Sequence, residues 1–178
     1  SAIDVGVGSG VMTYQLLKHG FNKVSATDSN PNAIHGLREA LAKKRITSKV
    51  ELFLGDLFAD CNPQTDLIVF NPPWLPLAND NEGIDKAMHY DEDLFLRFFT
   101  EALKHLKPEG RLVLLFSNLA QVTHLTKTNP IEEELEKGGR FQKDLLVKSK
   151  VKAASHKTRR NQTWREDELV ELWVLKPA

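Results

Sequence analysis

The sequence predicts an α/β fold built on a doubly wound, seven-stranded, mostly parallel sheet that ends in an antiparallel hairpin. Short apolar runs alternate with segments of helical periodicity as far as Lys137, which is typical of a parallel sheet with helices on both faces. Residues that cap helices or form turns separate most of these segments. The last two strand-like runs have no helical segment between them, and this predicts the hairpin.

The first part of the chain predicts two strands and two helices. The apolar run Ala2–Val7 reads as a buried strand, and Gly10–His19 has helical spacing up to a capping glycine, Gly20. Lys23–Thr27 predicts the second strand. A second helix begins at Asn30-Pro31, because asparagine favours the N-cap and proline favours the first helical position.

Three further strands and one helix are expected in the middle of the chain. Val50–Leu54, Asp66–Phe70 and Arg111–Ser117 are apolar runs of strand length. The helix opens at Asp91-Glu92-Asp93, where carboxylates suit the positive end of the helix dipole. It ends before a predicted turn at Pro108-Glu109-Gly110.

The C-terminal part predicts one short helix and the hairpin. Ile131–Lys137 has helical spacing and stops at Gly138-Gly139. Two alternating runs follow, near Phe141–Lys152 and Glu168–Lys176, and Ala153–Asp167 connects them.

The composition is that of one globular domain. Hydrophobic residues make up 41% and charged residues 27% of the chain, and no apolar run is long enough to span a bilayer. We expect residues 1–178 to form a single domain cut from a longer chain whose N-terminal part is missing. The lone cysteine, Cys61, excludes an internal disulfide and a cysteine-based zinc site, and the histidines show no metal spacing. We therefore expect no metal, no membrane partner and a reducing, cytoplasmic setting.

Charge is distributed unevenly, although the net charge is zero. Residues 51–101 hold 11 acidic and 2 basic side chains, and residues 140–165 hold 1 acidic and 9 basic ones. The basic stretch includes Arg159, Arg160 and Trp164, a mixture of cations and an aromatic ring that suits contact with RNA. A solvated hairpin face explains the same stretch equally well.

A glycine-rich turn follows the first predicted strand in the segment DVGVGSG, and Gly6, Gly8 and Gly10 alternate in it. Backbone without side chains allows a ligand to approach closely. In the dinucleotide fingerprint the last two glycines are three residues apart, whereas here they are two apart and Val11 occupies the third glycine position. The spacing therefore counts against NAD and FAD.

An aspartate also follows each of the next two strands. Asp28 lies 18 residues beyond Gly10, a place where a carboxylate accepts both hydroxyls of a ribose. Asp56 follows the third strand and can accept from an adenine amino group, with Leu57 against the ring. Each aspartate taken alone is also a common turn residue.

The fourth strand ends in FNPPWLP, which suits methylation of a planar nitrogen. The nitrogen of an amide or a base amine is a poor nucleophile, because its lone pair is delocalised. Asn71 offers a side-chain oxygen and Pro72 a main-chain oxygen, so both N–H hydrogens can be accepted. Pro73 stiffens the backbone and preorganises these acceptors, while Trp74 can stack on the flat group.

The segments DVGVGSG, ATDSNPNAI, GDLF and DLIVFNPPW resemble, in order and spacing, the class I S-adenosylmethionine-dependent methyltransferases. The N-P-P-aromatic signature is similar to that of the branch that methylates amino groups, in the methyltransferase-small group. The resemblance covers nearly the whole chain and implies a Rossmann-like methyltransferase fold. The family often has tyrosine or phenylalanine where this chain has Trp74, which indicates a different target shape.

The resemblance also implies roles for the motif residues. The three glycines pass beside the methionine part of S-adenosylmethionine, and Asp4 helps to hold its amino end. Asp28 binds the ribose, and Asp56 and Leu57 contact the adenine. The target amine is held by the catalytic set Asn71, Pro72, Pro73 and Trp74.

Two acceptors remain open. The basic stretch favours a base amine in ribosomal RNA, the preferred reading. The acidic loop with Asp80, Glu82 and Asp85, in the aperiodic segment after Trp74, favours a glutamine of a protein such as a release factor. Two other function classes are a donor-binding scaffold without catalysis, against which the intact NPPW motif argues, and a nicotinamide enzyme, against which the glycine spacing argues.

Overall fold

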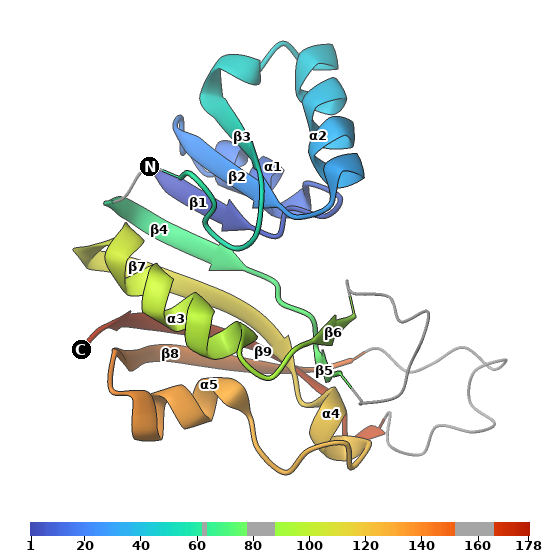
Figure 1. Cartoon of the computed structure of the whole chain (residues 1–178), viewed down its shortest axis with the longest axis vertical. Helices are drawn as coiled ribbons and strands as arrows, with labels where there is room; N and C mark the ends of the chain where they lie inside the picture. The colour runs from blue at the N-terminus through green and yellow to red at the C-terminus, as the bar shows by residue number, and fades with distance from the viewer. Residues whose placement is uncertain (62–63, 78–87, 152–165) are drawn as a thin grey trace, which may run out of the picture.

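The architecture is a seven-stranded sheet with helices on both faces (Figure 1). The computed structural model describes residues 1–61, 64–77, 88–151 and 166–178. The strand order is β3-β2-β1-β4-β7-β9-β8; neighbours from β3 to β7 are parallel, and β9 is antiparallel to both β7 and β8. The strand bounds are β1 Ala2–Val5, β2 Val24–Asp28, β3 Val50–Leu54, β4 Thr65–Phe70, β7 Leu106–Ser117, β8 Phe141–Lys150 and β9 Leu169–Pro177. This topology confirms the predicted fold class and hairpin.

The helices form two layers that lie on opposite faces of the sheet. One face packs against α1 (Val11–Lys18), which lies behind the sheet in Figure 1, and against α2 (Pro31–Lys43). The other packs against α3 (Leu94–His105) and α5 (Pro130–Glu133), which a π-helical turn, η2 (Glu134–Gly138), continues. A four-residue helix, α4 (Leu119–Val122), follows β7 and was not predicted.

Aromatic side chains dominate the core on the α3 face. The ring of Phe98 lies 4.5 Å from that of Phe70 at the end of β4, and 5.7 Å from that of Phe58. Phe95 meets Phe116 of β7 edge to face, at 5.6 Å. Rings packed this way contribute on the order of 1 kcal/mol each beyond their burial, so α3 is held firmly against the sheet.

The predicted start of α2 is confirmed. Pro31 occupies the first helical position, and the Asn30 side chain accepts from the Asn32 backbone N–H at 2.9 Å. Gly20 follows α1 with a φ of +91°, the left-handed conformation that glycine allows after a helix end.

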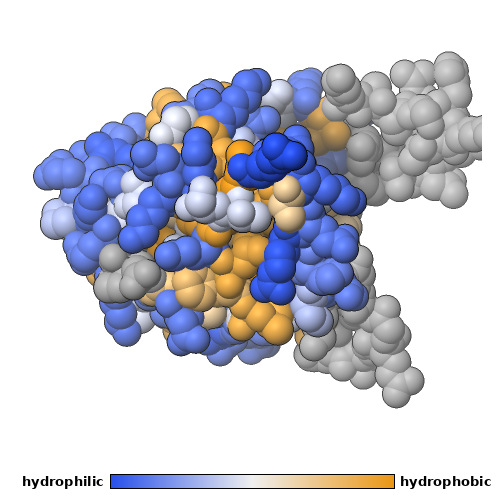
Figure 2. All heavy atoms as spheres, turned by 90° about the horizontal axis from the view of Figure 1, so that it is seen from above, coloured by the Kyte–Doolittle hydropathy of each residue, from blue (hydrophilic) through white to orange (hydrophobic). Residues whose placement is uncertain are grey.

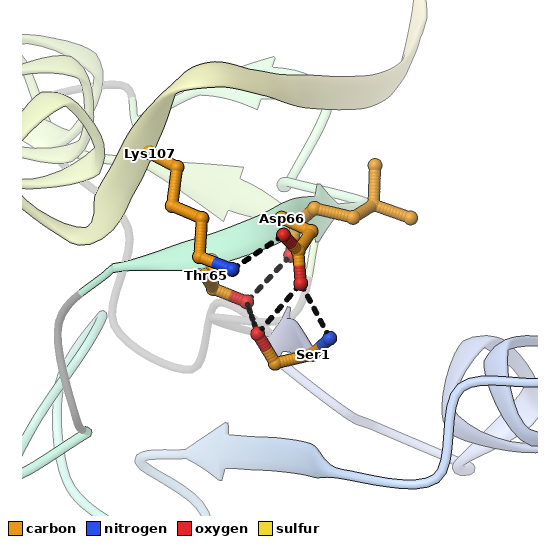
Figure 3. A network of polar contacts seen from close by, with 5 residues as sticks. Ser1, Thr65, Asp66 and Lys107 are labelled. Atoms are coloured by element: carbon orange, nitrogen blue, oxygen red, sulfur yellow. Dashed lines mark hydrogen bonds and ion pairs between the residues drawn. The ribbon is translucent and has the colours of Figure 1, made fainter.

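The prediction that Pro108-Glu109-Gly110 forms a turn before the strand is wrong, because these residues lie within β7. Leu106 pairs with Thr65 and Arg111 already pairs with Leu67, so five β7 residues from 106 to 110 lie opposite only two of β4. The turn-forming residues make a bulge inside a longer strand. At the same end of the sheet, Lys107 of the bulge donates to Asp66 at 2.6 Å (Figure 3).

The segment after Trp74 was expected to lack regular structure, but it contains a small parallel pair. β5 (Leu75–Pro76) lies beside β6 (His89–Tyr90). The N–H groups of Leu75 and Leu77 donate across the pair at 3.1 and 2.8 Å, so the missing N–H of Pro76 leaves no gap in the ladder.

The two outer strands leave apolar side chains in contact with water. Leu54 ends the edge strand β3 and is 59% exposed. Seen from the α2–β3 end, apolar side chains gather in the middle of the face and hydrophilic ones surround them (Figure 2). At the other edge, β8 pairs with β9 alone, and Phe141 is its one buried residue.

The cap of α2 gives a test of this local structure. Asn30→Ala should lower the free energy of unfolding by about 1 kcal/mol, because the Asn32 N–H loses its acceptor. Asn30→Ser, which keeps an acceptor oxygen, should stay close to the wild-type value. Urea denaturation measures both; equal losses in the two variants would contradict the capping role.

Candidate active site

Four sequence motifs meet at one edge of the sheet. The strands β2, β1 and β4 are parallel and in register, so that Val5 lies beside both Thr27 and Phe70. The residues that follow these strands are therefore neighbours, as predicted for the carboxyl edge of such a sheet. β3 joins the same edge, because Leu54 pairs with Asp28.

The glycine turn has a backbone that only glycine adopts without strain. Gly6, Gly8 and Gly10 have φ values of +68°, +49° and +79°, all in the left-handed region. A Cβ on Gly10 would lie 2.8 Å from Leu37 of α2, whereas a Cβ on Gly8 would meet nothing within 4 Å. The turn is thus packed on one side and open beside Gly8, which suits a ligand lying against its backbone.

Asp28 fixes the shape of this turn. Its carboxylate accepts from the backbone N–H of Gly8 and from that of Asn30, each at 2.8 Å. A carboxylate has about four acceptor positions, so two bonds leave capacity for the hydroxyls of a ribose. The carboxylate of Asp28 thus lies beside the glycine turn, and its binding to a ribose stays a prediction.

Asp4 is a buried acid beneath the turn. It is 1% exposed, and its carboxylate accepts from the Thr13 hydroxyl of α1 at 2.5 Å. Burial raises the pKa of Asp4 to about 6, although the hydrogen bonds with Thr13 lower it. The sequence reasoning missed Thr13; its only signal is a polar side chain on the buried face of α1.

The aspartate after β3 is held by a residue that the sequence reasoning also missed. Asp56 forms an ion pair with Arg97 of α3 through Oδ2. Leu57 is 7% exposed and packs in the core on the α3 face, with a φ of +45° that is unusual for a leucine. Its carbonyl accepts from the Thr27 hydroxyl at 2.5 Å, which holds this conformation. The adenine contacts of Asp56 and Leu57 stay predictions.

The NPPW motif leaves β4 beside the glycine turn. Asn71 is exposed, Pro72 is buried, and Pro73 and Trp74 are half-buried. The Trp74 indole N–H donates to the Leu115 carbonyl of β7 at 3.3 Å, and its ring packs against the core on the α3 face. The indole is therefore anchored at one side, and its stacking on a target stays a prediction.

A groove of about 760 Å³ begins where this motif runs into β5. Its apolar surface includes Pro76, Tyr90, Phe95, Leu96 and Phe99. Its acidic residues are Asp91, Glu92, Glu133 and Glu134, and its cations are Lys137 and Arg140. Lys137 pairs with Glu133 and Arg140 with Glu134, so both cations are neutralised within the groove and its surface is acidic.

Some sequence predictions lie outside the described residues. These are the acidic loop with Asp80, Glu82 and Asp85, and the basic residues Arg159 and Arg160 with Trp164. Within the described part, no helix is long and apolar enough to cross a membrane.

Comparison with known proteins gives consistent matches. The family model described as "Methyltransferase small domain" matches residues 1–142. A proposed protein N5-glutamine methyltransferase of Methanocaldococcus jannaschii is 29% identical over 147 residues, which are 78% of this chain and 73% of that protein. The ribosomal RNA small subunit methyltransferase C of Haemophilus ducreyi is 35% identical over 63% of this chain, but the match spans only 31% of that relative.

Solved structures share the fold. The ribosomal protein L11 methylase of Lactobacillus delbrueckii subsp. bulgaricus superposes with a TM-score of 0.63 at 21% identity, covering 99% of this chain and 70% of that one. At this identity the likeness bears on the fold alone.

The titration of Asp4 gives a second test. Its folded pKa of about 6 exceeds the ordinary 3.8, so the folded state binds this proton more tightly than the unfolded state. The protonated Asp4 therefore stabilises the folded state, fully below pH 4. This stabilisation, on the order of 3 kcal/mol, is lost as pH rises through 6. Asp4→Asn should remove this loss.

The free energy of unfolding of wild type and of Asp4→Asn is measured by denaturation at pH 4 and at pH 7. The difference between the two proteins isolates Asp4, because the other carboxylates contribute equally to both. The exposed Asp144 supplies the control, Asp144→Asn. If wild type and Asp4→Asn lost the same stability over this range, Asp4 would not be the buried acid described.

Proposed function

This chain belongs to the methyltransferase small domain family, and from that premise we propose that it transfers a methyl group from S-adenosylmethionine to a planar nitrogen. The observation that carries the proposal is the meeting of exposed Asn71 with the glycine turn and Asp28 at one sheet edge. A single domain of residues 1–178 in a reducing, cytoplasmic setting is part of the same proposal.

The residues of the edge fit the donor. The open side of the turn at Gly8 accepts the methionine part against bare backbone, and Asp28 has acceptor capacity left for the ribose. Asp4 lies beneath the turn, where its ionised form favours the donor's ammonium group. When bound, S-adenosylmethionine supplies a methyl carbon made electrophilic by its sulfonium. No metal or strong base is needed for this chemistry.

The acceptor nitrogen is held by main chain and side chain together. Oδ1 of Asn71 and the carbonyl oxygen of Pro72 accept its two N–H hydrogens, which draws the nitrogen toward a tetrahedral geometry and aims its lone pair at the donor. The buried Pro72 and the anchored Trp74 restrain the loop, so these acceptors need little reorganisation.

Two acceptors fit this geometry. A base amine of ribosomal RNA is one, by analogy with the Haemophilus ducreyi relative, and the basic segment outside the described residues argues for it. A protein glutamine, as in a release factor, is the other, by analogy with the Methanocaldococcus jannaschii relative. The acidic groove beside the motif favours the glutamine, because its carboxylates repel phosphates.

Labelled donor distinguishes these acceptors. The protein is incubated with S-adenosylmethionine labelled in its methyl group and with either total RNA or purified release factors. Label in RNA alone identifies RNA as the acceptor, and label in protein alone identifies the release factor; digestion of the labelled product then locates the methylated nitrogen. Donor binding without transfer to either would favour the scaffold reading.

The proposed catalytic role of Asn71 predicts a separation of turnover from donor binding. Asn71→Ala should lower kcat by about 10²–10³-fold, because one of two acceptors for the target amine is lost. Its donor affinity, measured by calorimetry, should stay close to that of wild type. Asn32→Ala removes another exposed asparagine, in α2, and should leave both quantities unchanged. Loss of donor binding together with turnover would mean that Asn71 is structural.

A further inference from the structure

One arginine joins two segments at the donor edge. Arg97, the fourth residue of α3, contacts Asp56 through one terminal nitrogen and Asp91 through the other, at 3.4 Å in the latter case. Its Nε lies 3.2 Å from Asp93. Three carboxylates thus surround one guanidinium, whose planar set of donors suits several acceptors at once. The side chain is 34% exposed, so solvent screens these pairs only in part.

Asp56 depends on this contact for its orientation. The backbone of its turn is fixed, since Gly55 donates to the Asp28 carbonyl at 3.0 Å and Ala59 donates to the Asp56 carbonyl at 2.9 Å. The side chain, however, is 65% exposed, and Arg97 is its only hydrogen-bond partner among the described residues. An exposed aspartate without a partner samples several rotamers.

The arginine also balances the local charge. Asp91 and Asp93 precede or cap α3, and with Asp56 they gather negative charge around one cation. Without Arg97 these carboxylates would repel each other, and Asp56 would turn away toward water. With Arg97 in place, Oδ2 of Asp56 is engaged, and no other described residue occupies Oδ1.

We propose that Arg97 is a positioning residue that aims Oδ1 of Asp56 at the 6-amino group of the donor's purine, and so makes the protein selective for adenine. The inference rests on the proposed function, because it takes the donor to lie along the edge formed by Asp28 and Asp56. It adds a determinant of donor specificity on α3, outside the four motifs. No covalent step is involved.

Calorimetry with two ligands tests the proposal. One is S-adenosylhomocysteine, and the other is its 6-deamino analogue, in which hydrogen replaces the purine amino group. Wild type should bind S-adenosylhomocysteine about 10- to 100-fold more tightly than the analogue, because the analogue offers no donor to Oδ1 of the charged Asp56 carboxylate. In Arg97→Gln this ratio should fall to within about threefold of unity, with the analogue's own affinity little changed.

Three further variants complete the design. Arg97→Lys keeps the charge but cannot contact three carboxylates together, so its ratio should lie between those of wild type and Arg97→Gln. Asp56→Ala, which has no side-chain acceptor, should lose the preference as Arg97→Gln does. Arg111→Gln is the matched control: this arginine is 37% exposed, pairs with Asp144 and sits beside Leu67 at the far end of β4, and its loss should leave the ratio unchanged.

The outcomes separate this inference from the proposed function. If Arg97→Gln is folded by circular dichroism and keeps the wild-type ratio, the positioning role is refuted. If Asp56→Ala also keeps the ratio, Asp56 does not face the purine and the inference falls, while donor binding stands. If wild type binds neither ligand, the proposed function itself is refuted and the inference with it.

Discussion

The pair of hydrogen bonds accepted by Asp28 is the interaction on which the candidate site depends. One bond holds Gly8, and so fixes the turn after β1; the other holds Asn30, at the start of α2. A single side chain thereby sets the spacing between two adjacent strand–helix connections. The carboxylate holds the N–H of Gly8 and leaves the space beside its Cα open, since a Cβ added there would meet nothing within 4 Å. The other residues proposed to bind the donor lie along the same sheet edge.

Two departures from low-energy structure lie at the same edge. Asp4 is a carboxyl group in a buried position, and Leu57 has a left-handed backbone without being glycine. Each is held by a threonine hydroxyl, from Thr13 and Thr27 respectively. Such costs persist only where the surroundings impose them, and they gather at functional sites. Their position agrees with a ligand site along this edge.

Much of the fold follows from local sequence signals. The strand Val50–Leu54 has the predicted bounds, and the Asn30 cap has the predicted hydrogen bond. The order of motifs along the sheet edge was predictable as well, because parallel strands bring their carboxyl ends together. These features depend on periodicity or on neighbours within a few residues.

The missed features depend on contacts between distant residues. Arg97 and Asp56 are 41 residues apart, and nothing in the pattern of α3 marks Arg97 as the partner of the turn after β3. In the sequence, Pro108-Glu109-Gly110 resembles a turn, because proline and glycine occur both in turns and in bulges. The strand includes these residues because Leu106, which precedes them, pairs with Thr65 of β4.

The exposed strand β8 has a consequence for how the molecule opens. It is bonded along one side only, to β9, and Phe141 is its one buried residue. Its amide protons should therefore exchange with deuterated solvent through local fraying, whereas those of β1 and β4, central in the sheet, await global unfolding. Because β8 and the strands β1, β2 and β3 lie on opposite sides of β4 in the strand order, β8 can detach while the candidate site at the ends of those strands stays intact.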